Sequence, residues 1–155
     1  MPLIDPGKKA PAFTLEDQEG RVHRLSDYDG RPLVLYFYPK DDTPGCTREA
    51  CDFRDALPKF KKSRAAVVGV SVLDEASKAR FARKHGLTFP LLADADHKVA
   101  ERYGTWQEKS RYGRTYMGIA RTTYLVGPDG KVARRWDNVK VEGHADDVLA
   151  AVGTL

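Results

Sequence analysis

Cysteine is scarce in this chain, whose 155 residues include only Cys46 and Cys51. Two cysteines cannot build the several disulfides that hold a small secreted scaffold together, so we expect a fold that does not depend on them. In a reducing compartment such a pair is more often catalytic or redox-sensing. We therefore expect cysteine redox chemistry and, because no signal peptide or membrane span is recognisable, a cytoplasmic protein.

Long apolar runs and clustered histidines are also missing. No stretch approaches the roughly 18 apolar residues of a membrane span, and the N-terminus lacks the apolar core of a signal peptide, so we expect no membrane association. The histidines show none of the paired spacing of zinc sites. Cysteine redox chemistry itself requires neither a metal nor an organic cofactor, and we expect neither. The four histidines are His23, His85, His97 and His144.

Charge of one sign is not concentrated anywhere along the chain. Lysine and arginine number 26 against 22 acidic residues, a formal net charge of +4, and the two signs are interleaved throughout. A nucleic-acid-binding face needs a basic patch or a recognisable binding motif, and neither is present. We therefore expect no nucleic-acid partner.

The apolar pattern predicts an α/β domain with a mixed central sheet flanked by helices, for which the thioredoxin-like arrangement is the natural candidate. A single domain spans 1–155 and begins with a hairpin of strands 12–15 and 22–25. We expect further strands at 33–38, 65–72, 91–93, 122–126 and 131–136. Helices are expected from Cys46 to Leu57, with Pro58 disturbing the end, and over 75–85, 97–103 and 145–152. Residues 107–118 are polar and contain glycine, so we expect a long loop there.

Cys46 follows the apolar strand 33–38 and the turn-forming run 39–45, which places it in the first turn of the next helix. Free backbone amides and the helix dipole favour a thiolate there. A free thiol is only about 3% ionised at neutral pH. To ionise most of it, the pKa must fall by about 2.5 units, which takes roughly 3.4 kcal/mol. A helix terminus contributes about 0.3 to 1 kcal/mol, or about 2 kcal/mol when partly buried. A nearby cation is therefore required.

Three cations are candidates for this role. Lys40 and Arg48 are close in the chain, whereas Arg121 would have to arrive through the fold. An arginine is the better chemical choice because its forked donors can hold a thiolate and an oxygen-bearing substrate together.

Thr43 has two interpretations of equal weight. Its hydroxyl either caps the helix by accepting from the Cys46 amide, or also faces the thiolate and the substrate.

Cys51 follows Cys46 by five residues in the same predicted helix. Residues five apart on a regular helix have Cα atoms about 8.7 Å apart, whereas a disulfide needs at most about 6.8 Å. If the two cysteines bond, the first turns of the helix must unwind. The alternative is that Cys51 is a small residue on an exposed helix face without a redox role.

Other function classes compete with a catalytic redox cysteine. A thioredoxin-like protein dithiol/disulfide exchanger would prefer the closer Cys-x-x-Cys spacing, which is absent. A peroxide-sensing or metal-binding module could use the two cysteines, and a cysteine hydrolase would need a histidine base that no local feature supplies.

The run 39–46, Pro-Lys-Asp-Asp-Thr-Pro-Gly-Cys, resembles the peroxiredoxin signature, and the position of Cys51 is similar to that in the bacterioferritin comigratory protein or peroxiredoxin Q subfamily. The resemblance covers nearly the whole chain, including 94–100, 116–123 and 139–145.

This resemblance implies a thiol-dependent peroxidase that reduces hydrogen peroxide and organic hydroperoxides. Cys46 would be the peroxidatic cysteine and Cys51 the resolving cysteine, in a Cys46–Cys51 disulfide recycled by thioredoxin or a similar dithiol reductant. The implied positioning residues are Thr43 and Arg121 for the peroxide, Pro39 as a shield of the pocket and Glu49 as the support of an arginine. An internal disulfide removes the need for a second subunit, and we expect a monomer.

Overall fold

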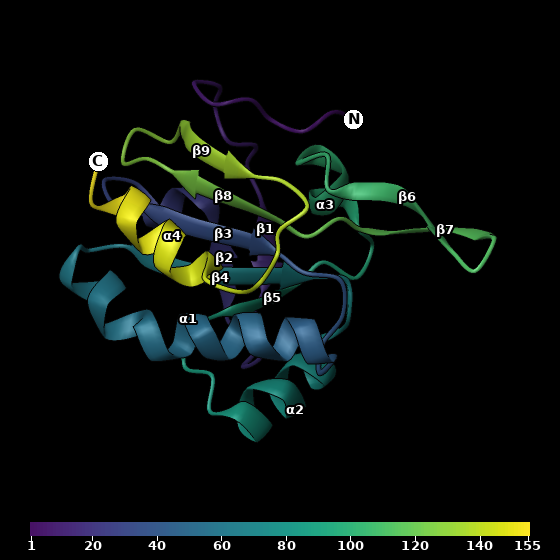
Figure 1. Cartoon of the computed structure of the whole chain (residues 1–155). Coiled ribbons are helices and arrows are strands. Elements are labelled where there is room, and N and C mark those ends of the chain that lie inside the picture. The colour runs from purple at the N-terminus through teal and green to yellow at the C-terminus, as the bar shows by residue number, and fades with distance from the viewer.

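A seven-stranded mixed sheet forms the centre of the computed structural model, which describes residues 1–155 (Figure 1). In order across the sheet the strands are β2 (Val22–Arg24), β1 (Thr14–Glu16), β5 (Leu91–Ala93), β4 (Ala66–Ser71), β3 (Leu33–Phe37), β8 (Thr122–Val126) and β9 (Val132–Trp136). The pairs β3–β4 and β4–β5 are parallel and the others are antiparallel. The predicted thioredoxin-like fold with an N-terminal hairpin is confirmed.

Helices cover both faces of this sheet. They are α1 (Pro44–Lys62), α2 (Glu75–His85), α3 (Lys98–Arg102) and α4 (His144–Val152), with a short 3-10 helix at Leu25–Tyr28. Side chains of β3 alternate between two cores, as the period of two in a strand requires. Val34 and Tyr36 join the core under α1, α2 and α4, whereas Leu35 and Phe37 join the core on the α3 side. Because both faces are covered, β3 is apolar throughout.

Helix α1 is longer than the sequence predicted. It continues through Pro58 to Lys62, although Pro58 has no amide hydrogen to donate to the preceding turn. Pro58 lies on the exposed face, while Leu57 and Phe60 on either side of it are buried against the core. Burial of these apolar side chains outweighs the one missing hydrogen bond.

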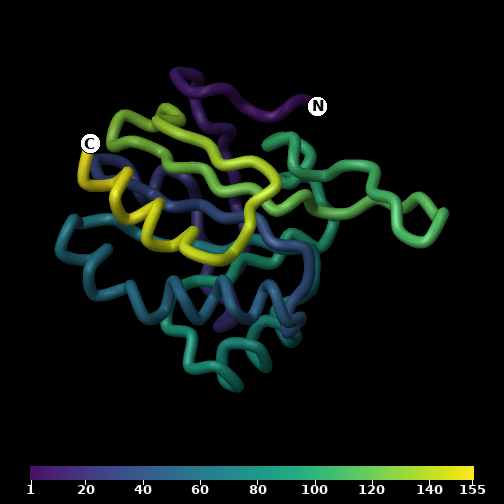
Figure 2. The backbone as a smooth tube through the Cα atoms, in the orientation of Figure 1, coloured from purple at the N-terminus to yellow at the C-terminus, as the bar shows by residue number.

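The predicted loop at 107–118 is wrong. These residues form the hairpin of β6 (Trp106–Arg111) and β7 (Arg114–Ile119), which extends away from the body of the molecule (Figure 2). Tyr112 and Gly113 make its tight turn with φ of 52° and 74°. Most residues of the hairpin are exposed, on both of its faces, so the sequence shows no apolar alternation there.

The N-terminal segment runs beside β9 at one edge of the sheet (Figure 2). Gly7 donates to the Val132 carbonyl and Val132 donates to the Lys8 carbonyl. This covers an edge strand that would otherwise offer unpaired backbone groups. No helix is both long enough and apolar enough to cross a bilayer.

Candidate active site

Cys46 lies at the start of α1, just after the loop that connects β3 to this helix. Thr43 is the N-cap with extended backbone angles, Pro44 is the first helical residue, and the Thr47 amide donates to the Thr43 carbonyl. Cys46 therefore lies in the first turn, where amides have no partner within the helix. The side chain is part of the core beneath α1 and the residue is 1% exposed.

Arg121 reaches Cys46 from the junction between β7 and β8, 75 residues further along the chain. Its Nη2 donates to Cys46 Sγ at 3.3 Å, and its Nη1 donates to Glu49 Oε1 at 2.7 Å. Cys46 and Glu49 are three residues apart on α1 and so share one helix face. The planar fork of arginine fits both partners at once, which a lysine ammonium could not do in this arrangement.

Gly45 makes room for this guanidinium. A Cβ atom at position 45 would lie 3.1 Å from Arg121 Nη2, tighter than ordinary van der Waals contact. A side chain here would therefore push the guanidinium away from Cys46.

Glu49 is a buried carboxyl with only one of its oxygens bonded. The residue is 1% exposed, and Oε2 has no hydrogen-bond partner. Burial raises the pKa of Glu49 to about 7, against the opposing effect of Arg121. Burial acts to lower the pKa of Arg121, but the neighbouring Glu49 and Cys46 raise it above its ordinary value. Arg121 thus remains a fixed positive charge beside the sulfur.

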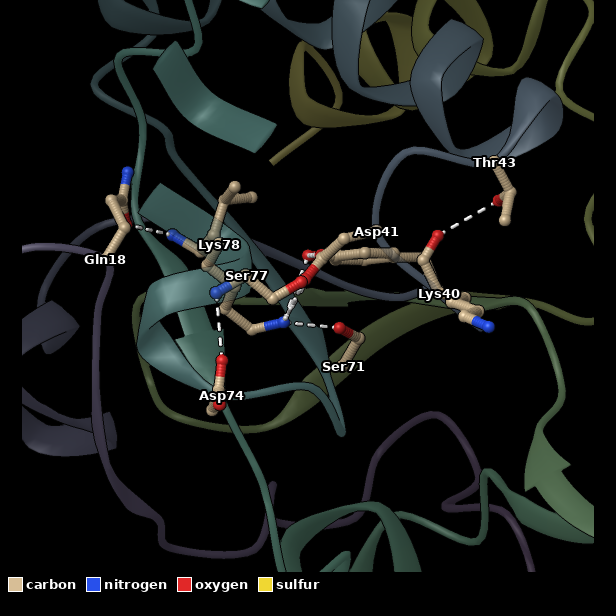
Figure 3. A network of polar contacts seen from close by, with 10 residues as sticks. Gln18, Lys40, Asp41, Thr43, Ser71, Asp74, Ser77 and Lys78 are labelled. Carbon is tan, nitrogen blue, oxygen red and sulfur yellow. Dashed lines mark hydrogen bonds and ion pairs between the residues drawn. The ribbon is translucent and has the colours of Figure 1, made fainter. Parts of the chain in front are cut away.

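Thr43 caps the helix by position but not by its side chain. Its hydroxyl donates to the Lys40 carbonyl at 2.9 Å, and no side-chain bond to the helix amides forms (Figure 3). The expectation that the hydroxyl accepts from the Cys46 amide is wrong, because this rotamer turns it toward the loop. Because the hydroxyl proton is used in the hydrogen bond to the Lys40 carbonyl, the lone pairs of the Thr43 oxygen remain available to accept a hydrogen bond from a protonated ligand.

The other two candidate cations do not contact the thiol. Arg48 has a side chain that is 60% exposed and pairs with Asp52 at 3.9 Å, and Lys40 is exposed. Pro39 lies half-buried two residues after the end of β3, on the approach to α1. Of the three cations, the fold brings only Arg121 to the sulfur.

Lys109 is a further cation that the sequence did not indicate. It belongs to β6, is half-buried, and donates from Nζ to the Ile119 carbonyl at 2.9 Å. Burial and the charge of Arg121 lower its pKa, while Cys46 raises it. Predicting the β6–β7 hairpin would have placed Lys109 near Arg121, since the hairpin leads directly to that residue.

Cys51 lies two helical turns beyond the start of α1 and is partly exposed. Neither cysteine is in a disulfide, and α1 is continuous from Pro44 to Lys62. In this state the two Cα atoms are as far apart as a regular helix makes them, about 8.7 Å.

No histidine is bonded to Cys46. His144 is hydrogen-bonded to Thr123 Oγ1 at 2.8 Å, and His85 pairs with Asp42 at 3.0 Å. No three histidine, cysteine or acidic side chains are grouped as metal ligands would be. A hydrolase needs a base within hydrogen-bond reach of its nucleophile, and the charged group in that place is an arginine.

A thioredoxin-like sheet that presents a helix-terminal cysteine to an arginine defines a cysteine-dependent oxidoreductase. Residues 6–135 match the AhpC/TSA family. The chain therefore belongs to the AhpC/TSA family, in its Bcp/peroxiredoxin Q branch, and is a thiol-dependent peroxidase.

Its similarity to known proteins extends over nearly the whole chain. It is 45% identical to peroxiredoxin Bcp of Bacillus subtilis (strain 168) over 146 residues, 94% of this chain and 93% of the relative. It is also 45% identical to peroxiredoxin Bcp of Escherichia coli (strain K12) over 149 residues, 96% of each chain. A structure of the Xanthomonas campestris bacterioferritin comigratory protein superposes with a TM-score of 0.91 at 41% identity, covering 97% of this chain and 98% of the other.

Proposed function

We propose that Cys46 is the residue that reduces the peroxide, with Arg121, Thr43, Glu49 and Pro39 arranging the site. The observation that carries this proposal is the Arg121 fork, which contacts Cys46 Sγ and Glu49 Oε1 together. The substrates are hydrogen peroxide and organic hydroperoxides, in keeping with the alkyl peroxide reduction described for the Xanthomonas campestris relative.

In the first step, the Cys46 thiolate attacks the distal peroxide oxygen and the O–O bond breaks. The sulfur becomes a sulfenic acid, and the departing oxygen leaves as water or an alcohol once it is protonated. Arg121 stabilises the thiolate and the developing negative charge on the leaving oxygen. Thr43 accepts a hydrogen bond from the peroxide, Pro39 shields the pocket from water, and Glu49 keeps the guanidinium in place.

In the second step, Cys51 attacks the Cys46 sulfenic acid. An S–S bond forms, the sulfenic oxygen leaves as water, and the first turns of α1 must unwind to bring the sulfurs together. In the third step, an external dithiol reduces this disulfide by thiol–disulfide exchange and is itself oxidised. We assign that role to thioredoxin or a similar dithiol protein. Because both cysteines belong to one chain, the cycle needs one subunit, and we assign a cytoplasmic monomer.

Peroxide consumption by the wild type, Cys46→Ser and Cys51→Ser tests this scheme. Cys46→Ser is expected to lose turnover, whereas Cys51→Ser should reduce one peroxide per site and then fail to be recycled by thioredoxin. Peroxide consumption by Cys46→Ser at the wild-type rate would refute the scheme.

Amide hydrogen exchange tests the unwinding. Exchange across residues 46–56 should increase when the wild type is oxidised, since the first turns lose their helical hydrogen bonds. Cys51→Ser provides the control, because it can be oxidised without forming the internal disulfide. Equal protection in reduced and oxidised wild type would count against the Cys46–Cys51 bond.

A further inference from the structure

Lys78 is a buried charge that the reaction scheme does not use. It belongs to α2 and is 0% exposed, which is rare for lysine unless the charge is paired. Its Nζ lies 3.4 Å from both carboxylate oxygens of Asp41 and 3.3 Å from the Tyr38 hydroxyl, and it also bonds Ser71 Oγ. Burial lowers the pKa of Lys78, while Asp41 raises it.

Asp41 lies on the loop that connects β3 to Cys46, so the ion pair ties this loop to α2. The Ser77 hydroxyl of α2 donates to Asp41 Oδ2 at 2.7 Å, and the Tyr38 hydroxyl donates to Oδ1. Figure 3 shows Ser77 and Lys78 beside Asp41, Ser71 beside the Lys78 ammonium, and Lys40 and Thr43 on the same loop as Asp41. The loop is thus joined to the ends of two strands and to a helix by one buried network.

The next residue of the loop supports this view of a restrained segment. Asp42 has a left-handed backbone with φ of 58°, a conformation that favours glycine. Such a backbone persists when surrounding contacts determine it. Asp42 also pairs with Lys84 Nζ at 2.9 Å, but that pair is exposed to solvent. The loop is therefore linked to α2 by a buried ion pair, Asp41–Lys78, and by an exposed ion pair, Asp42–Lys84.

These ties limit the segment that can reorganise when Cys46 moves toward Cys51. Asp41 precedes Cys46 by five residues, and Cys51 follows it by five. With Asp41 held by Lys78 and the later turns of α1 intact, the residues between these two fixed ends must rearrange. A released Asp41 would give the segment additional freedom at its N-terminal end.

We propose that the Asp41–Lys78 ion pair is a positioning element that restrains opening of the first turn of α1 and so sets the rate of Cys46–Cys51 disulfide formation. The proposal rests on Cys51 as the resolving residue. The ion pair thereby also affects how readily Cys46 is overoxidised, because a second peroxide competes with Cys51 for the Cys46 sulfenic acid.

Lys78→Met tests the proposal, since it removes the charge and keeps a long side chain. After one equivalent of peroxide, the disulfide should form about tenfold faster than in the wild type, because breaking a buried pair favours the open state. The oxidation of Cys46 itself, measured in a Cys51→Ser background, should not become faster. The peroxide concentration that overoxidises half of Cys46 should rise about tenfold as well.

Lys84→Met is the matched control, because it removes a lysine of the same helix that pairs with the same loop at the surface. Its disulfide should form within about twofold of the wild-type rate. The double variant Asp41→Asn/Lys78→Met covers the case in which Lys78→Met folds poorly, since removing both buried charges avoids leaving one unpaired. The double variant should also form the Cys46–Cys51 disulfide faster than the wild type.

Amide exchange of residues 42–50 in the reduced protein gives a readout that does not depend on Cys51. Exchange should increase in Lys78→Met and remain unchanged in Lys84→Met. A purely structural role would lower thermal stability without accelerating resolution. Unchanged or slower disulfide formation in both the single and double variants would overturn the proposal. Absence of any internal disulfide in oxidised wild type would instead refute the role of Cys51, and the exchange comparison would then decide whether the pair restrains the loop.

Discussion

Replacing Arg121 by glutamine should show how much of the reactivity of Cys46 comes from a residue outside its own helix. The guanidinium contacts Sγ at 3.3 Å. Coulomb attraction between unit charges at this distance is about 5 kcal/mol for an effective dielectric constant near 20. Glu49 lies 2.7 Å from the other guanidinium nitrogen and offsets part of that attraction. A charged hydrogen bond contributes about 1.5 to 3 kcal/mol net, and we take this range for the lost interaction.

We therefore expect Arg121→Gln to reduce kcat/KM for hydrogen peroxide by about 10- to 100-fold. The assay is single-turnover oxidation in a Cys51→Ser background, so that resolution and recycling do not contribute. Arg121→Lys keeps the charge but loses the fork, and should also be slower than the wild type.

Arg48→Gln is the matched control, since it removes the same charge from the N-terminal half of α1 at an exposed position. It should react within about twofold of the wild type, because exposed pairs contribute little. Loss of Arg121 also leaves Glu49 without its partner. Burial already raises the pKa of Glu49 to about 7, so this carboxyl can take up a proton. The double variant Arg121→Gln/Glu49→Gln removes the remaining effect of that unpaired group.

A folded Arg121→Gln protein that reacts with peroxide as fast as Arg48→Gln would refute the role of Arg121. Such a result would mean that the helix terminus alone activates the thiol. It would contradict the requirement for a cation that follows from the limited energy of the helix dipole.

Three further perturbations test other parts of the structure. Thr43→Val should lower kcat/KM for peroxide about tenfold in single-turnover assays, whereas Thr43→Ser should remain within about threefold, because only serine keeps the hydroxyl. Burial lowers the pKa of His144 from 6.5 to about 4, so the unfolded chain takes up the proton first. The free energy of unfolding should therefore fall as the pH drops from 6.5 toward 4, and urea titrations of His144→Asn should show a shallower fall; equal slopes would contradict this. Gly104→Ala should lower the melting temperature in calorimetry, because φ is 73° and a Cβ would lie 2.4 Å from the Pro2 carbonyl; an unchanged value would contradict the close approach.

The sequence alone determined the features that depend on short-range patterns. The apolar run before Cys46, the proline after Thr43 and the period of the following residues predict a buried strand, a turn and a helix. The left-handed end of α2 at Gly86 is equally local. These patterns place Cys46 in the first turn of a helix and show that its distance from Cys51 exceeds the length that a disulfide spans.

Tertiary structure alone decided which groups surround that thiol. Lys40, Arg48 and Arg121 were all candidates from the sequence, and only the path of the chain through β7 and β8 brings Arg121 to the sulfur. The β6–β7 hairpin was missed because its exposed faces give no apolar alternation. Lys78 gave no local signal either, since a lysine on an amphipathic helix ordinarily faces water. Periodicity and capping report burial and backbone conformation along a few turns, whereas the partner of a charge depends on which distant segments the sheet places side by side.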